Sequence, residues 1–153
     1  MRAALLAALL CAGACSPPAA TTEAPAAVEP PPTPSPDATT QALLNILTPL
    51  TTSEVGKPVS LRPNTVTVRD EWAYVDAAVL NADGSAIDWS TTNLASAYEN
   101  GAMDSGGGLH ALLKNEAGTW VVLEHAIAPT DVAWIDWASR HGVPPDILGL
   151  PSN

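Results

Sequence analysis

The chain has 153 residues, with 16 Asp and Glu against 6 Lys and Arg, and a formal net charge of −10. This length allows one domain with attached segments, and the acidic balance excludes the basic footprint of a nucleic-acid-binding protein. It also disfavours direct docking onto anionic lipid. Both cysteines, Cys11 and Cys15, lie in the first fifteen residues, so the rest of the chain has neither thiol catalysis nor a cysteine-ligated zinc site.

The first fifteen residues, MRAALLAALLCAGAC, are typical of a secretory signal. Arg2 precedes an apolar run that is too short to cross a bilayer, since a spanning helix needs about 20 apolar residues. The residues Ala-Gly-Ala at 12–14, followed by Cys15, resemble the lipobox of bacterial lipoproteins. The resemblance implies that residues 1–14 are removed, that Cys15 carries a lipid, and that the protein is periplasmic or associated with the outer membrane. An ordinary signal peptide cleaved nearby is the alternative.

Residues 15–36 form a Pro/Ala-rich stretch, with eight of the fifteen prolines in the run SPPAATTEAPAAVEPPPTPSP. Nothing in it repeats with the period of a helix or a strand. Such a composition predicts a disordered, semi-rigid tether of polyproline II type, reaching on the order of 65 Å at about 3.1 Å per residue. We therefore expect a single folded domain at 37–153.

The folded part opens with a helix expected at 37–48. Ser35 or Asp37 can cap its start, and apolar residues then follow helical spacing, namely Leu43, Leu44, Ile46, Leu47 and Leu50. Pro49 is expected to end the helix, because proline removes a backbone donor.

In residues 64–80, apolar and polar side chains alternate as they do in the two strands of a β-hairpin. If Val68 pairs with Ala73, one face carries Val and Ala and the other carries Thr, Arg, Trp72 and Tyr74. This segregation predicts a half-buried antiparallel hairpin. Asn81 to Gly84 is a turn signal.

Residues 85–108 give the weakest signals. A short helical turn is expected around Leu94, Ala97 and Tyr98, and the glycines at 106–108 indicate a loop or a bulge at a strand entry.

A second hairpin is expected at 109–127, around the turn Asn115-Glu116-Ala117-Gly118. Asn at the first position and Gly at the fourth suit a type I turn with a bulge. This turn pairs Asn115 with Thr119 and places His110 directly opposite Glu124. A register one residue away would mix Leu113 with Trp120, so the first register is preferred because it segregates polarity better.

The stretch HAIAPTDVAWIDWASRHG at 125–142 predicts a closing helix. Thr130-Asp131 can cap its start, Gly142 can end it, and Asp136 and Arg140 are spaced for a surface ion pair. Trp134 and Trp137 share one helical face. They are expected to pack on the sheet, or alternatively to form an exposed aromatic recognition face.

His110 and Glu124 are the candidate acid–base pair, because a carboxylate opposite a histidine favours its charged form. The alternative is a plain cross-strand ion pair on the surface. No metal site is expected from His110, His125 and His141, which lack HxH or HExxH spacing and would point to different faces. His125 is expected to bond backbone or Asp131. No phosphate-binding motif is present, and no cofactor is expected.

The segment GTWVVLEHAIAPTDVAWIDWASRHGVP resembles the C-terminal part of uncharacterised exported bacterial proteins, in which W-x-V leads to T-D-V-x-W-x-D-W. The resemblance covers about thirty residues. It implies a compact domain and transfers no catalytic residues.

Together these patterns predict an α+β domain: a small antiparallel sheet of about four strands, with an N-terminal and a C-terminal helix packed on one face. The expected function is that of a lipid-anchored envelope protein with a non-enzymatic binding domain and an unidentified envelope partner. The candidate binding residues are Trp134, Trp137, Trp89 and Tyr98. One alternative is a small-ligand carrier with a pocket lined by tryptophans and the loop at 85–108. Another is a small hydrolase or isomerase using His110 and Glu124.

Overall fold

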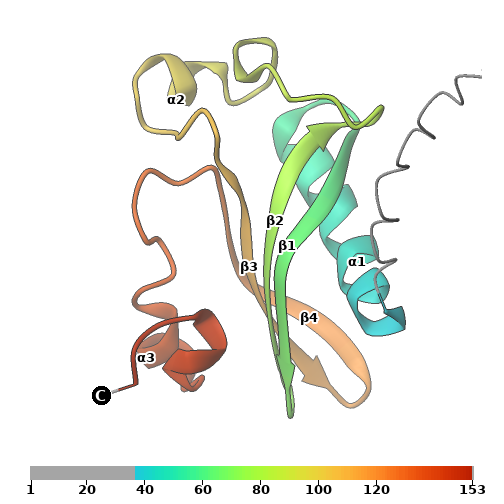
Figure 1. Cartoon of the computed structure of the whole chain (residues 1–153), viewed down its shortest axis with the longest axis vertical. Helices are drawn as coiled ribbons and strands as arrows, with labels where there is room; N and C mark the ends of the chain where they lie inside the picture. The colour runs from blue at the N-terminus through green and yellow to red at the C-terminus, as the bar shows by residue number, and fades with distance from the viewer. Residues whose placement is uncertain (1–36, 153) are drawn as a thin grey trace, which may run out of the picture. The chain divides into compact units, whose positions relative to one another are not determined.

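The computed structural model describes residues 37–152, and Figure 1 shows their arrangement. The predicted leader, the lipidation site Cys15 and the tether at 15–36 lie outside the described residues. In chain order the elements are α1 (Ala38–Val55), β1 (Val59–Arg69), β2 (Trp72–Asn81), the 3-10 turn η1 (Trp89–Thr91), α2 (Ala95–Glu99), β3 (Gly108–Glu116), β4 (Thr119–Ile127), α3 (Trp137–His141) and the 3-10 turn η2 (Pro145–Leu148). No helix within 37–152 is long and apolar enough to cross a membrane.

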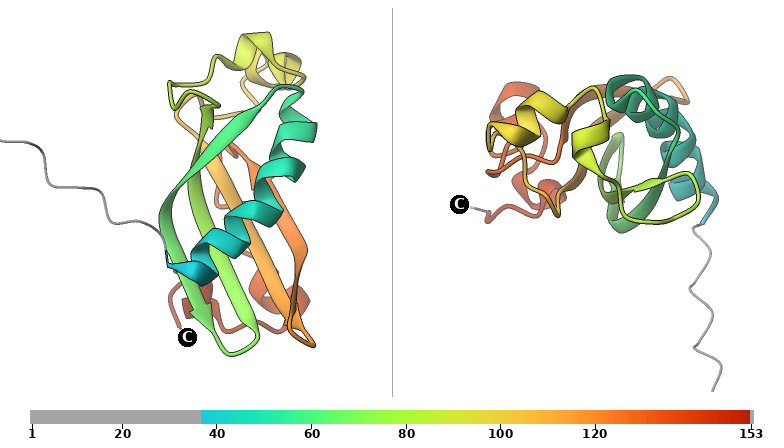
Figure 2. Two further views of the ribbon diagram at one scale, coloured as in Figure 1. Left: turned by 90° about the vertical axis from the view of Figure 1, so that its right-hand side faces the viewer. Right: turned by 90° about the horizontal axis from the view of Figure 1, so that it is seen from above.

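The four strands form one antiparallel sheet in the order β1-β2-β3-β4, so each strand pairs with its neighbour in the sequence. This confirms the predicted α+β class and the four-stranded antiparallel sheet. One layer of the domain is α1, the second is the sheet, and the third is the C-terminal part of the chain (Figures 1 and 2).

The first helix begins where the sequence predicts but runs about two turns further, to Val55. The Asp37 side chain accepts a hydrogen bond of 2.8 Å from the Thr40 N–H, as an N-cap does. The predicted end at 48 is wrong, because Pro49 sits on the exposed side while the buried positions continue beyond it to Thr51 and Val55. Burial of that stripe against the sheet outweighs the one backbone donor that proline removes.

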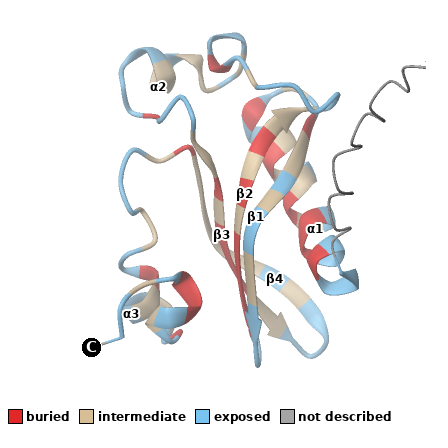
Figure 3. Cartoon of the chain, viewed as in Figure 1, coloured by how far each residue is buried: buried red, intermediate tan, exposed pale blue. Residues whose placement is uncertain are grey.

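The first hairpin has the predicted register, with Val68 opposite Ala73 and Val66 opposite Val75. We call the sheet face that α1 covers the inner face. Its β2 residues are fully buried aliphatic side chains, and Leu109, Ala111 and Leu113 of β3 continue the same core (Figure 3).

The second hairpin has a different register from the predicted one. Ala117 and Gly118 form a two-residue turn with φ of 52° and 90°, so Asn115 faces Trp120 instead of Thr119. A register shift between Leu112 and Leu113 then restores the alternation, because it moves the β4 partner by one further residue. His110 therefore faces Ala126, and the predicted His110–Glu124 pairing is wrong.

The two terminal helical segments lie on opposite faces of the sheet (Figure 1), so the prediction that both pack on one face is wrong. The outer face, opposite α1, carries apolar side chains that also need cover. We call residues 129–152, which supply that cover, the C-terminal lobe. The outer core combines sheet residues Trp72, Tyr74 and Leu112 with lobe residues Trp137, Val143, Ile147 and Leu148.

The chain reaches the outer face through a sharp reversal after β4. Ala128 is fully buried with φ of 49°, and its N–H donates to the Gly108 carbonyl over 2.7 Å. Gly107 packs so closely here that a Cβ on it would lie 2.5 Å from the Ala128 Cα, a separation that real side chains do not reach. The glycine run is thus a strand entry, as expected, and close backbone approaches require glycine at two of its positions, since a Cβ on Gly108 would overlap the Ala77 carbonyl oxygen.

The closing helix is shorter than predicted. Only Trp137–His141 is helical, the Thr130-Asp131 cap does not form, and residues 131–136 make tight turns instead. The end at Gly142 and the Asp136–Arg140 ion pair, at 3.2 Å, are as predicted.

Candidate functional site

Three aromatic rings meet on the outer face. The His110 ring stacks on Trp134 with centroids 3.9 Å apart, and its Nδ1 lies 2.9 Å from the Tyr74 hydroxyl. Tyr74 belongs to β2, His110 to β3 and Trp134 to the turn before α3. The cluster therefore joins the lobe to two neighbouring strands.

Electrostatics keep both polar members of this cluster neutral. Burial raises the pKa of the Tyr74 hydroxyl well above its usual range, with Asp76 adding to the effect. Burial lowers the pKa of His110, and the opposing attraction of Asp76 is smaller. The contact between the Tyr74 hydroxyl and His110 Nδ1 is thus a hydrogen bond between two neutral groups, each of which can donate or accept.

Glu124, the predicted partner of His110, belongs to a different group. Its Oε1 lies 2.9 Å from His141 Nε2 and 2.8 Å from Arg140 Nη1, both on α3. Arg140 also contacts Asp136. These contacts fix α3 to β4, so Glu124 helps to dock the lobe on the sheet. The cross-strand pairing that suggested an acid–base pair of His110 and Glu124 does not form.

His125 lies on the inner face, where its Nε2 is 2.5 Å from Glu54 Oε1 in the last turn of α1. The predicted partner, Asp131 or backbone, is wrong, because the His125 ring bonds the Glu54 carboxylate on α1 instead. Each histidine thus has its own partner on a different element. Within residues 37–152 no three His, Cys, Asp or Glu side chains come together as a metal site would need.

The four aromatic candidates for binding have different surroundings. Trp137 and Trp89 are each 2% exposed, one in the outer core and the other in the inner core. Tyr98 packs against the inner core and is partly buried. Trp134 is partly buried beneath the turn that carries it. The Trp89 indole N–H is buried without a hydrogen-bond partner among the described residues.

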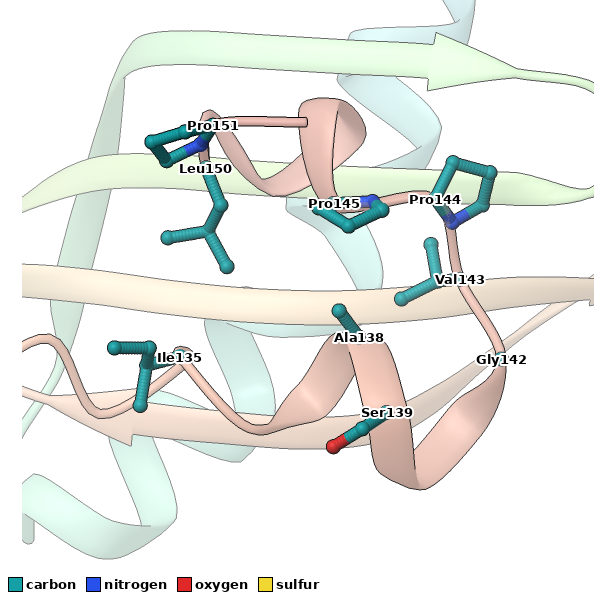
Figure 4. Close-up of a pocket in the computed structure, with 9 residues that line it drawn as sticks. All are labelled: Ile135, Ala138, Ser139, Gly142, Val143, Pro144, Pro145, Leu150 and Pro151. Atoms are coloured by element: carbon teal, nitrogen blue, oxygen red, sulfur yellow. The ribbon is translucent and has the colours of Figure 1, made fainter. Parts of the chain in front are cut away.

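One apolar opening in the described part of the chain was not found from the sequence. It is a groove of about 630 Å³ between α3 and the chain end, shown in Figure 4. Ile135, which is 66% exposed, forms one side, and Leu150 and Pro151 form another. Its remaining lining residues are Ala138, Ser139, Gly142, Val143, Pro144 and Pro145. The run GVPPDILGLP supplies much of the lining, but its apolar residues follow neither helical nor strand period, so no sequence pattern indicates the groove.

Comparison with family models, curated proteins and solved structures finds no match to this chain. The function of this domain therefore has to be inferred from its own residues and their geometry.

Proposed function

We propose that this protein is exported, lipid-anchored in the cell envelope through Cys15, and that its domain binds a protein partner through the groove of the C-terminal lobe. The lipobox-like leader and the Pro/Ala-rich stretch at 15–36 support the anchoring. The observation that carries the binding role is Ile135, a large aliphatic side chain held exposed at the wall of an apolar groove. Exposed apolar surface of this kind marks interaction sites.

The lining of the groove indicates what it binds. Ser139 is the one lining residue with a polar side chain, so the site offers little hydrogen bonding and suits aliphatic groups. Three of its lining residues are prolines. Because the proline ring fixes φ, the backbone there is held in place and the groove is preformed in the absence of a ligand.

The charge of the chain indicates the kind of partner. With a net charge of −10, the protein attracts a positively charged partner and repels an acidic one. The partner is therefore a basic envelope protein that inserts an aliphatic segment into the groove. Association of this type is faster at low salt, because ions screen the attraction.

The binding test compares two exposed aliphatic residues in capture from envelope extract. Ile135→Glu places a charge in the groove, whereas Val68→Glu places one on β1, where Val68 is 43% exposed and lies on the inner face of the sheet, away from the groove. A partner retained by wild type and Val68→Glu but lost with Ile135→Glu supports the proposal. A partner that both variants retain, or that both lose, overturns it.

The anchoring test uses Cys15→Ala. The wild-type chain should fractionate with membranes and incorporate labelled fatty acid, and the variant should do neither. A variant that still fractionates with membranes contradicts lipid anchoring at this position.

A small-ligand carrier is the second candidate, because the groove volume falls within the range of about 300–1,000 Å³ common for ligand sites. Trp137 flanks Ala138 of the lining, so its fluorescence should report occupancy. A saturable fluorescence change with small apolar ligands, abolished by Ile135→Glu, would favour the carrier over the protein-binding role.

A further inference from the structure

The two outermost strands of the sheet, β1 and β4 (Figure 2), differ in how their free edges are protected. A free edge presents unpaired backbone N–H and C=O groups, and another strand can pair with it. On β1, Pro63 lacks the N–H, and the register shifts between Pro63 and Thr65. β4 contains neither proline nor lysine, and none of its residues is fully buried. The open edge of this sheet is therefore β4.

Two backbone hydrogen bonds of β3 establish which groups of β4 face that edge. The Asn115 N–H donates to the Glu71 carbonyl over 2.7 Å, which directs Asn115 towards β2. The Gly108 carbonyl accepts from the Ala128 N–H over 2.7 Å, which directs Gly108 towards the β4 side. Because successive residues of a strand bond alternate neighbours, every second residue of β3 bonds β2, namely Leu109, Ala111, Leu113 and Asn115.

The residues of β4 opposite this set direct their N–H and C=O groups away from β3. We call these four the edge residues: Trp120, Val122, His125 and Ile127. Within residues 37–152, β4 pairs with β3 alone, and no other backbone or side-chain hydrogen bond reaches the edge groups of these four residues. The edge thus offers two donor–acceptor pairs on each side of the register shift opposite Leu112.

The spacing of the edge residues reads the same in both directions along the strand, because the register shift lies at its centre. A second copy running antiparallel therefore places Trp120 opposite Ile127 and Val122 opposite His125, so that all the edge groups of both copies meet. Residues that face each other in this way exchange both N–H···O bonds. A regular strand from another protein lacks the extra residue at the centre and would match the edge on only one side of it.

The side chains also match across this pairing. Trp120 and Ile127 lie together on the inner face, and aromatic and β-branched side chains form favourable cross-strand pairs. On the outer face, Val121, which is 38% exposed, lies opposite Ala126. The acid of β4 is Glu124, close to the two-fold axis, and in each copy Arg140 already contacts its carboxylate.

We propose that two copies of this chain associate through antiparallel pairing of their β4 strands, which joins the two sheets into one. The assembly closes at two copies, because the edges that remain are β1, which Pro63 and the register shift protect. The inference goes beyond the proposed function, since no lining residue of the groove belongs to β4. A charge of −10 on each copy opposes the association, so salt should strengthen it.

The first test is sedimentation of the full chain with Cys11→Ser and Cys15→Ser, which remove both thiols and the proposed lipid site. We expect a monomer–dimer equilibrium whose dissociation constant falls as the salt concentration rises. Binding of a basic partner in the groove has the opposite dependence on salt. A chain that stays monomeric up to about 1 mM, or a dimer that salt weakens, overturns the proposal.

Val122→Pro removes an outward N–H that no hydrogen bond within the chain uses. The interface loses two donors by symmetry, so the dissociation constant should rise on the order of tenfold or more. Circular dichroism shows whether the variant folds. If it does not, a second comparison decides. Val121→Glu places an acid beside the two-fold axis and should weaken the dimer, whereas Val68→Glu adds the same charge on β1 and should change it much less.

The register is tested with single cysteines in the same background. Val121→Cys and Ala126→Cys lie about 17 Å apart on one strand, at about 3.3 Å per residue, which is too far for a disulfide within one chain. Across the dimer they face each other as a non-hydrogen-bonded pair, with Cα atoms about 4.5 Å apart. Oxidation should cross-link a mixture of the two variants and neither variant alone. Equal cross-linking of a single variant contradicts this pairing.

Another occupant of the edge would give a different result. If the chain alone is monomeric and an envelope protein captured by wild type is lost with Val122→Pro, a strand of that protein covers β4 and the proposal fails. The outcome is distinct from that of the groove test, which depends on Ile135. A dimer that forms while capture is independent of Ile135 leaves this inference standing and the proposed function refuted.

Discussion

The two faces of the sheet are built by different means. The inner face is covered by one long helix over aliphatic side chains, with a single His125–Glu54 contact at its edge. The outer face is covered by short turns over aromatic rings, and ion pairs fix the lobe at two points. The inner face therefore forms an ordinary hydrophobic core. The outer face carries the His110 cluster, the Glu124–His141 contact and, in the lobe, the exposed Ile135. This difference places the candidate functions on the outer side.

The largest effect is expected from removing the main anchor of the lobe. Trp137→Ala should lower the free energy of unfolding by about 3–5 kcal/mol, because it leaves a cavity in the outer core. Urea unfolding followed by circular dichroism measures this loss. A loss below about 1 kcal/mol would show that the outer face contributes little to the stability of the domain.

A smaller loss of stability is expected at the start of α1, the helix that covers the inner face. Asp37→Ala removes the side-chain acceptor of the Thr40 N–H and should cost about 0.5–2 kcal/mol. Asp37→Asn keeps an acceptor and is the matched control. Equal losses in the two variants would show that the cap is not the cause.

The pH dependence of stability should come from the outer face. Since burial lowers the pKa of His110 in the folded state, the unfolded chain binds the proton more readily. Stability from this group is therefore present above about 6.5 and is lost as the pH falls below that value. Unfolding midpoints of wild type and His110→Asn should converge in acid. Parallel midpoints at all pH values would contradict the assignment.

The smallest effect is expected at the Arg69–Asp146 pair, which links the end of β1 to η2. Its two contacts, 2.6 and 2.9 Å, form a fork, and the arginine lowers the pKa of the Asp146 carboxyl. Both side chains are exposed, so water and salt weaken the pair. Arg69→Gln should lower the melting temperature slightly at low salt and not at high salt. A loss that salt does not change would point to packing of the arginine stem instead.

The sequence predicts those elements of the fold whose geometry is set by local patterns, such as the alternation of a strand, the spacing of a helix or the residues of a turn. The first hairpin follows its alternation, because Val and Ala fill one side without exception. The second hairpin does not follow its predicted register. Ala117 adopts a left-handed conformation, which is rare for residues other than glycine and asparagine, and the resulting turn shifts the register. That shift separates His110 from Glu124.

The candidate site depended on information that the sequence does not carry. Leu112, Tyr74 and Trp72 give the outer face an apolar core of its own, so alternation could not say which face each terminal segment covers. The groove is formed by turns and prolines, which lack a period that could reveal it. By contrast, the Asp136–Arg140 pair depends only on helical spacing and was predicted correctly.

The order of the strands has a consequence for how the chain folds. Because every strand pairs with its neighbour in the sequence, the sheet can form through short loops, and such local topologies fold quickly. The lobe comes last in the chain and docks on a surface that exists only after β2, β3 and β4 have paired. Formation of the groove thus requires that these strands have paired, so a partner that binds the groove would distinguish a domain with a formed sheet from an unfolded chain.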